Sequence, residues 1–173
     1  RDAKYALETT PTIASRLNLA QICMARGDYD EVIAVLEPAL TGQFSQDPSL
    51  LEGLAFAHFY KRDYKSAMGY IQRIYAHEDV KPKDYVRLLR AQVLEETGDL
   101  DGALAELTDL VKFFSGEQAR IELAALYEKM RNHEKAQEIY VDIVNRAKRA
   151  PSYYREREKE WISVAEQRLS GRS

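Results

Sequence analysis

Apolar and small residues recur at helical spacing before each of four polar turns in the chain. Before the first turn they are Leu19, Ala20 and Cys23, which share one face of a helix. After each turn comes a small residue followed four positions later by a large one, as in Ala67 and Ile71. The small residue lets two helix backbones approach, and the large one fills the space between neighbouring helix pairs. The pattern therefore predicts a series of helix-turn-helix units.

The four turns have similar sequences and recur at a nearly constant interval. They are Gly27–Val32, Arg62–Ala67, Gly98–Ala103 and Arg131–Ala136. The last residues of successive turns lie 35, 36 and 33 positions apart. A period of about 34 residues is typical of a helix-turn-helix repeat.

Each turn carries signals that end one helix and start the next. Gly27 can close the preceding helix in a left-handed conformation, and Asp28 with Glu31 is arranged as a capping box for the following helix. The equivalent capping residues in the other turns are Asp63, Asp99 and Asn132. Arg62 and Arg131 stand where the other turns have glycine, so these two turns must close without the residue that adopts positive φ most easily.

Together these signals predict that almost the whole chain is helical. We expect helices at residues 2–9, 13–26, 29–41, 48–61, 64–77, 83–97, 100–114, 116–131, 133–149 and 152–170. Pro38 should kink the helix in which it falls, and Gly42–Gln46 should form the longest loop. Pro151, with Ser152 as the capping residue, should open the last helix.

Leu17–Ala20 and Gly27–Glu31 resemble the sequence pattern of the tetratricopeptide repeat (TPR) family. The chain lacks the closing proline in all four full repeats. It also departs from the tryptophan or leucine that the family favours at Arg16, Leu51, Arg87, Arg120 and Arg90. The resemblance is to a divergent TPR and covers nearly the entire chain.

The resemblance implies an all-α fold, a right-handed superhelix of about four helix pairs in a single domain of residues 1–173. Residues 1–12, around Tyr5–Pro11, would be the end of a preceding helix. Residues 150–173 would cap the repeats, with Trp161 on the first helix of an unfinished fifth repeat. The repeats themselves would span 13–46, 47–81, 82–115 and 116–149.

The C-terminal segment carries a second, narrower resemblance. Arg146–Arg155, followed by Glu160–Ile162, is similar to the end of an uncharacterised bacterial family of divergent TPR proteins. Members of that family have a short hydrophobic segment ahead of the repeats, which implies membrane anchoring with the repeats on the cytoplasmic side. The chain begins at Arg1 rather than methionine, so we expect it to be part of a longer protein.

The composition and motifs of the chain argue against catalysis and metal binding. The single cysteine, Cys23, excludes an intramolecular disulfide, and its place on an apolar helix face favours a packing role over a reactive thiol. His58, His77 and His133 belong to different helix pairs and lack the spacing of metal ligands. We find no glycine-rich phosphate loop or nucleophile elbow, and charges interrupt every apolar stretch before it reaches membrane-spanning length. The sequence predicts no enzyme, cofactor, metal or transmembrane helix within these residues.

TPR proteins bind partners in a concave groove lined by the first helix of each repeat. Carried onto this chain by the alignment of the turns, that geometry predicts an apolar patch with polar neighbours. Its residues are Leu17, Gln21, Met24, Glu52, Phe56, Phe59, Tyr60, Tyr85, Leu88, Gln92 and Ile121. In the alternative interpretation these side chains only fill the interior of a tightly wound superhelix.

The resemblance also bears on one known use of this groove. TPR domains that hold the acidic C-termini of heat-shock chaperones use Lys, Asn and Arg side chains, and the matching positions here contain no basic residue. They are Leu17, Gln21, Gly53, Tyr85 and Leu89. We therefore expect no binding of such tails in the groove.

The preferred function is a non-enzymatic scaffold whose groove receives a peptide or helix from a partner protein. The alternatives are self-association into a dimer, through the open, incomplete N-terminal edge or the Trp161 helix, and RNA binding, which the net charge of −3 opposes. Charge is uneven, because residues 146–173 hold eight Lys/Arg and four Asp/Glu. This segment suits either contact with anionic lipid or nucleic acid, or a solvated capping helix with internal ion pairs.

Overall fold

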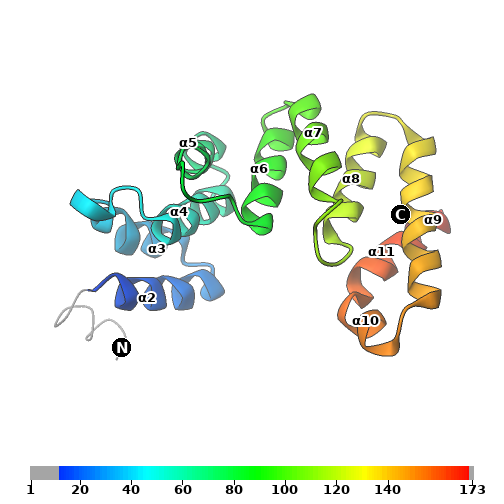
Figure 1. Cartoon of the computed structure of the whole chain (residues 1–173), viewed down its shortest axis with the longest axis horizontal. Coiled ribbons are helices and arrows are strands. Elements are labelled where there is room, and N and C mark those ends of the chain that lie inside the picture. Colours follow the sequence, from blue (N-terminus) through cyan, green and yellow to red (C-terminus); the bar gives the residue numbers. More distant parts are fainter. Residues whose placement is uncertain (1–11, 172–173) are drawn as a thin grey trace. The chain divides into compact units, whose positions relative to one another are not determined.

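The computed structural model describes residues 12–171, and all regular structure within them is helical (Figure 1). The α-helices are α2 (Ile13–Arg26), α3 (Tyr29–Leu36), α4 (Pro48–Tyr60), α5 (Tyr64–Tyr75), α6 (Asp84–Glu96), α7 (Leu100–Leu110), α8 (Gln118–Lys129), α9 (His133–Arg149), α10 (Ser152–Arg157) and α11 (Lys159–Leu169). Two short 3₁₀ turns, η1 (Glu37–Ala39) and η2 (Gly42–Phe44), follow α3. The predicted all-α fold class is confirmed, whereas the helix expected at residues 2–9 lies outside the described residues.

The helices fall into two compact units, Arg1–Val93 and Leu94–Ser173, with the boundary inside α6. In the first unit α2 packs on α3, α3 on α4 and α4 on α5. In the second unit α7 packs on α8, α8 on α9, and α11 on both α9 and α8.

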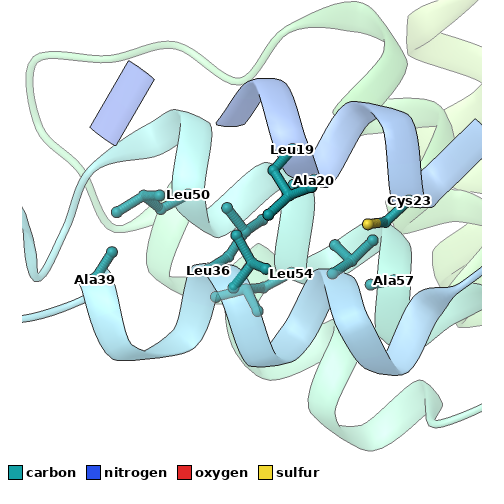
Figure 2. Close-up of a cluster of buried hydrophobic side chains, with 10 residues drawn as sticks. Leu19, Ala20, Cys23, Leu36, Ala39, Leu50, Leu54 and Ala57 are labelled. Carbon is teal, nitrogen blue, oxygen red and sulfur yellow. The ribbon is translucent and has the colours of Figure 1, made fainter. Parts of the chain in front are cut away.

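The core of the first unit is built where small residues bring helices together. One cluster joins α2, α3 and α4, and Figure 2 shows Ala20, Leu36 and Ala57 among its buried side chains. Gly53 of α4 belongs to the same contact, because a Cβ there would lie 2.5 Å from a methyl carbon of Leu36. A second cluster joins α4, α5 and α6 through fully or nearly fully buried side chains, namely Ala55, Ala67, Ile71, Leu89 and Val93.

The turns close as their sequences indicate. Gly27 has φ 77°, and its N–H and that of Asp28 bond back to the carbonyls of the last turn of α2. Arg62 and Arg131 adopt the same left-handed region, with φ 63° and 61°. Both arginines therefore hold a conformation that side chains normally disfavour by about 1–2 kcal/mol.

Three of the four predicted helix caps form. The side chains of Asp63, Asp99 and Asn132 accept backbone N–H bonds at 3.1, 2.9 and 3.2 Å from residues three positions later. The capping box predicted for Asp28 and Glu31 is wrong, because the Asp28 side chain makes no cap hydrogen bond. The backbone dihedral angles of Asp28 are close to those of Asp63, and the Asp28 side chain is exposed.

Two predicted helices end or break earlier than expected. The helix predicted at 29–41 ends at Leu36, and Pro38 then lies in the 3₁₀ turn η1, since proline cannot donate the next helical hydrogen bond. The helix predicted at 152–170 is divided at Glu158, and Ser152 is its first residue rather than its cap.

The break at Glu158 has a tertiary cause. Its carboxylate is buried and accepts the backbone N–H of Glu117 at 2.9 Å, while the Arg157 Nε lies 2.8 Å away. Gly116 leaves the room for this contact, because a Cβ there would lie 2.7 Å from a Glu158 oxygen. The loop before α8 is thereby joined to the junction of α10 and α11.

Glu117 itself is the most buried charged residue among those described, at 0% exposure. The Tyr154 hydroxyl donates to its carboxylate at 2.5 Å, Arg120 lies 3.3 Å away, and Arg146 lies 3.7 Å away. Burial, followed by the hydrogen bond to Glu117, raises the pKa of Tyr154, so its hydroxyl remains a donor. The Glu117–Glu158 pair and its partners thus form a satisfied polar core in the second unit.

Replacing Arg131 with glycine should stabilise the chain by about 0.5–1 kcal/mol, because glycine removes the left-handed penalty but gives the unfolded chain more freedom. Urea denaturation measures the change. Arg131→Ala is the matched control, since it removes the same charge but keeps a Cβ at positive φ. Equal stability of the two variants would contradict the backbone argument.

Glu117→Gln should destabilise the second unit by about 1–3 kcal/mol, because two arginines lose their buried counter-charge and the hydrogen bonds of the site are rearranged. Glu156→Gln is the control, because Glu156 is exposed and its ion pair with Lys159 is exposed too. The control should change stability by less than about 0.5 kcal/mol in the same denaturation experiment. A similar loss in both variants would show that the buried network adds nothing specific.

Candidate functional site

A cavity of about 510 Å³ opens in the first unit between α2, α4 and the start of α6. We call it the α2–α4 groove. Its lining residues are Leu17, Asn18, Ala20, Gln21, Met24, Val32, Leu36, Ser49, Glu52, Gly53, Phe56, Tyr60, Lys83 and Tyr85. Its floor is the cluster of Figure 2, since Ala20 and Leu36 belong to both.

Aromatic rings follow one another along the α4 side of the groove. Tyr60 stacks on Tyr29 with ring centroids 5.2 Å apart, and Phe56 lies 6.4 Å from Tyr60. Phe56 also contacts Tyr85 of α6, with centroids 6.0 Å apart. Tyr60 and Tyr85 remain 50% and 44% exposed, so the row presents aromatic surface to solvent.

Helix α2 supplies the opposite side of the groove. Leu17, Gln21 and Met24 lie four and three positions apart, which places them on one helix face. Leu17 and Met24 also pack against the core below, whereas Gln21 and Asn18 are exposed. This side therefore combines apolar surface with amide groups that can donate and accept hydrogen bonds.

A charged trio lies in the same groove. Lys83 Nζ is 3.2 Å from a Glu52 carboxylate oxygen and donates to the Tyr85 hydroxyl at 3.0 Å. The Tyr85 hydroxyl in turn donates to Glu52 at 2.5 Å. The hydrogen bond to Tyr85, with those to Glu52, raises the pKa of Lys83, and burial raises that of Tyr85. The trio keeps one positive and one negative charge, so its net charge is zero.

The structure brings together seven of the eleven residues predicted to line a groove. They are Leu17, Gln21, Met24, Glu52, Phe56, Tyr60 and Tyr85. Phe59 instead packs with Tyr64 beside the α4–α5–α6 cluster, and Leu88 is 95% buried, being 5% exposed. Gln92 does not line this groove, and Ile121 belongs to the core of the second unit.

Lys83 is the charged lining residue that sequence reasoning missed. It immediately precedes α6 and lies outside the helical face from which groove positions were assigned. The sequence held a signal for its position, since Lys83 precedes the predicted groove residue Tyr85 by two residues and follows another, Glu52, by almost one repeat. It supplies a cation where the matching groove positions have none, but Glu52 already pairs with it.

The cysteine and the three histidines do not line the groove. Cys23 is buried in the α2–α3–α4 core. His58 Nδ1 lies 3.1 Å from Asp63 and its ring stacks on Tyr70, while His77 follows α5 and His133 begins α9. Over residues 12–171 no group of three or more His, Cys, Asp or Glu is arranged to hold a metal ion. No helix in this range combines the length and apolarity that crossing a bilayer requires.

Two sequence models of the tetratricopeptide repeat match the chain, at residues 15–47 and 85–107. The first range contains all of α3 and nearly all of α2, and the second contains nearly all of α6 and most of α7. The chain contains divergent tetratricopeptide repeats. TPR proteins are generally non-enzymatic scaffolds that bind protein or peptide partners, and the repeats here support that class of function.

The chain is also similar to solved structures, of which that of the TPR protein YrrB is an example. The crystal structure of YrrB, described as a TPR protein with an unusual peptide-binding site, aligns with 81% of this chain and 89% of its own at 17% identity and a TM-score of 0.37. No curated protein matches this TPR sequence.

Proposed function

We propose that the α2–α4 groove is the site at which this TPR protein binds a peptide or helix from a partner protein. The observation that carries the proposal is the pair of half-exposed tyrosines, Tyr60 and Tyr85, at the edge of the cavity. Tyrosine is enriched among residues that dominate binding energy, because its ring buries much area and its hydroxyl finds a partner.

The packing behind Tyr60 supports this role. Stacking on Tyr29 and contacts with Phe56 and Phe59 limit the motion of the Tyr60 ring before any partner arrives. An anchor that is already held loses less conformational entropy on binding. The aromatic row is therefore suited to receive apolar side chains of a ligand.

The charge of the groove lining indicates the charge of the partner segment that would bind there. Glu52 and Lys83 neutralise each other, so a strongly charged segment gains little from the lining. Gln21 and Asn18 instead offer amides that can bond to peptide groups. The preferred ligand is an apolar, near-neutral segment of a protein. Self-association stays an alternative from the sequence, and so does RNA binding, which the net charge opposes.

Binding variants test this proposal. Peptides selected from a displayed random library against the wild-type chain should lose about tenfold or more in affinity on Tyr60→Ala. Gln21→Arg, at an exposed position on the opposite side, should weaken the same peptides without removing core volume. Fluorescence anisotropy measures affinity, and thermal melts check that the variants stay folded.

Tyr153→Ala is the matched control for these measurements. Tyr153 is 72% exposed and does not line the groove, so its loss should leave peptide affinity unchanged. The proposal fails if selected peptides bind the wild type and both groove variants equally, or if Tyr153→Ala weakens them as much as Tyr60→Ala does.

Acidic chaperone tails should not occupy the groove. Lys83 is its one cation among the described lining residues, and it is paired with Glu52 and Tyr85, so a carboxylate would be desolvated without a free basic partner. The measurement is competition: an acidic C-terminal peptide of a heat-shock chaperone should fail to displace a groove-selected peptide. Displacement at micromolar concentration would show that Lys83 is available after all.

A further inference from the structure

A second cavity, of about 380 Å³, lies in the other unit between α9 and the α10–α11 pair. Its apolar part is formed by Val144 and Ala147 of α9 and Ile162 of α11. These residues line the seam along which α9 and α11 pack, and Ala147 and Ile162 belong to the buried core there. The cavity is therefore a furrow between two helices, in which Val144 is half-buried and Ala147 and Ile162 are 6% and 9% exposed.

Three basic residues line the same furrow: Lys148, Arg155 and Lys159. The other polar lining residues are Ser163 and Glu166, so the charged lining side chains sum to +2. We call this set the C-terminal basic furrow.

The basic residues of the C-terminal helices divide into two groups by what they contact. Arg146 lies at the buried carboxylate of Glu117, and Arg157 lies at that of Glu158. Within the described part of the chain, the furrow cations contact no buried carboxylate. Over residues 12–171 no carboxylate pairs with Lys148 or Arg155.

The remaining contacts of the furrow cations are weak or local. Arg155 donates to the carbonyl of Ala150, which fixes the guanidinium near the α9–α10 turn and leaves its other N–H groups for a ligand. Lys159 lies 3.6 Å from Glu156, but these side chains are 75% and 79% exposed. Such a pair contributes little and can be exchanged for a ligand carboxylate.

We propose that the C-terminal basic furrow binds an acidic amphipathic helix of a partner protein, at a site separate from the α2–α4 groove. The apolar face of the helix would lie on Val144 and on the exposed edges of Ala147 and Ile162, which is the helix-in-groove mode of recognition. Carboxylates flanking that face would meet Lys148, Arg155 and Lys159. The charge complementarity selects an acidic ligand, and the apolar floor selects one with apolar side chains.

The neighbouring charges favour a protein ligand over a polyanion. Glu166 lines the furrow, and Glu156 and Glu160 interrupt the basic residues around it. A continuous row of phosphates on RNA or on an anionic membrane would meet these carboxylates as well as the cations. A helix can place its acidic residues only where the cations lie.

Fluorescence anisotropy with the whole chain tests the proposal. The probe is a labelled designed helix with leucines along one face and glutamates beside them. A second helix has lysine in place of glutamate, and a third keeps the glutamates but has serine in place of leucine. The first helix should bind with an affinity that falls as salt rises, and the other two should bind at least about fivefold more weakly.

Matched variants locate the binding. Lys148→Gln with Lys159→Gln should weaken the acidic helix about fivefold or more, whereas Lys112→Gln with Lys135→Gln, which changes net charge equally outside the furrow, should not. Tyr60→Ala should leave this binding unchanged, so failure of the groove proposal and failure of this one are distinguishable.

Three results would overturn the assignment. The first is no binding of the acidic helix, which would leave the segment a solvated capping helix. The second is equal weakening by both charge pairs of substitutions. The third is saturable binding of a 20-nucleotide single-stranded RNA or of phosphatidylserine vesicles, lost in the Lys148/Lys159 variant, at an affinity above that of the acidic helix.

Discussion

Close approach of helices at small buried residues is the constraint on which the rest of this structure depends. A helix pair of this length cannot bury its apolar faces alone, so each pair must pack on its neighbour. Ala55, Ala67 and Ala57 are fully buried, and Gly53 leaves room for a Leu36 methyl group. Because α4 can lie against both α3 and α5 in this way, its remaining face is free to carry Phe56, Tyr60 and Glu52 into the groove. The binding surface is thus a consequence of how the core is packed.

Local sequence signals predicted most of the fold because the turns are decided locally. Asp63, Asp99 and Asn132 cap their helices through bonds to residues three positions away, and such contacts can be read directly from sequence. The repeat period also located most of the groove lining, since equivalent positions on α2 and α4 face the same side. Leu88 was predicted to line the groove but is buried. Its burial depends on which side chains pack over it, and the pattern of its own helix does not contain that information.

The features that sequence reasoning missed depend on partners far away in the chain. Glu158 divides the expected last helix because it bonds to Glu117, 41 residues earlier. Lys83 reaches Glu52 across 31 residues, from the position immediately before α6. Asp28 shows that a favourable cap sequence is not sufficient, since its exposed side chain makes no cap hydrogen bond. Polar contacts of long range are specified by tertiary packing, and a single sequence gives them little local signature.

The bond between Glu117 and Glu158 also has a consequence for the order of events when the chain is made. The segment before α8 leaves the ribosome well ahead of Tyr154 and Glu158. Until these residues follow, the Glu117 N–H lacks its acceptor, and the Glu117 carboxylate lacks the Tyr154 hydroxyl and has only Arg120 and Arg146 among its partners. The second unit therefore cannot complete its polar core co-translationally until its final helices emerge. Synthesis interrupted before Glu158 would leave a nascent chain with unsatisfied polar groups, which quality-control proteases can recognise as unfolded.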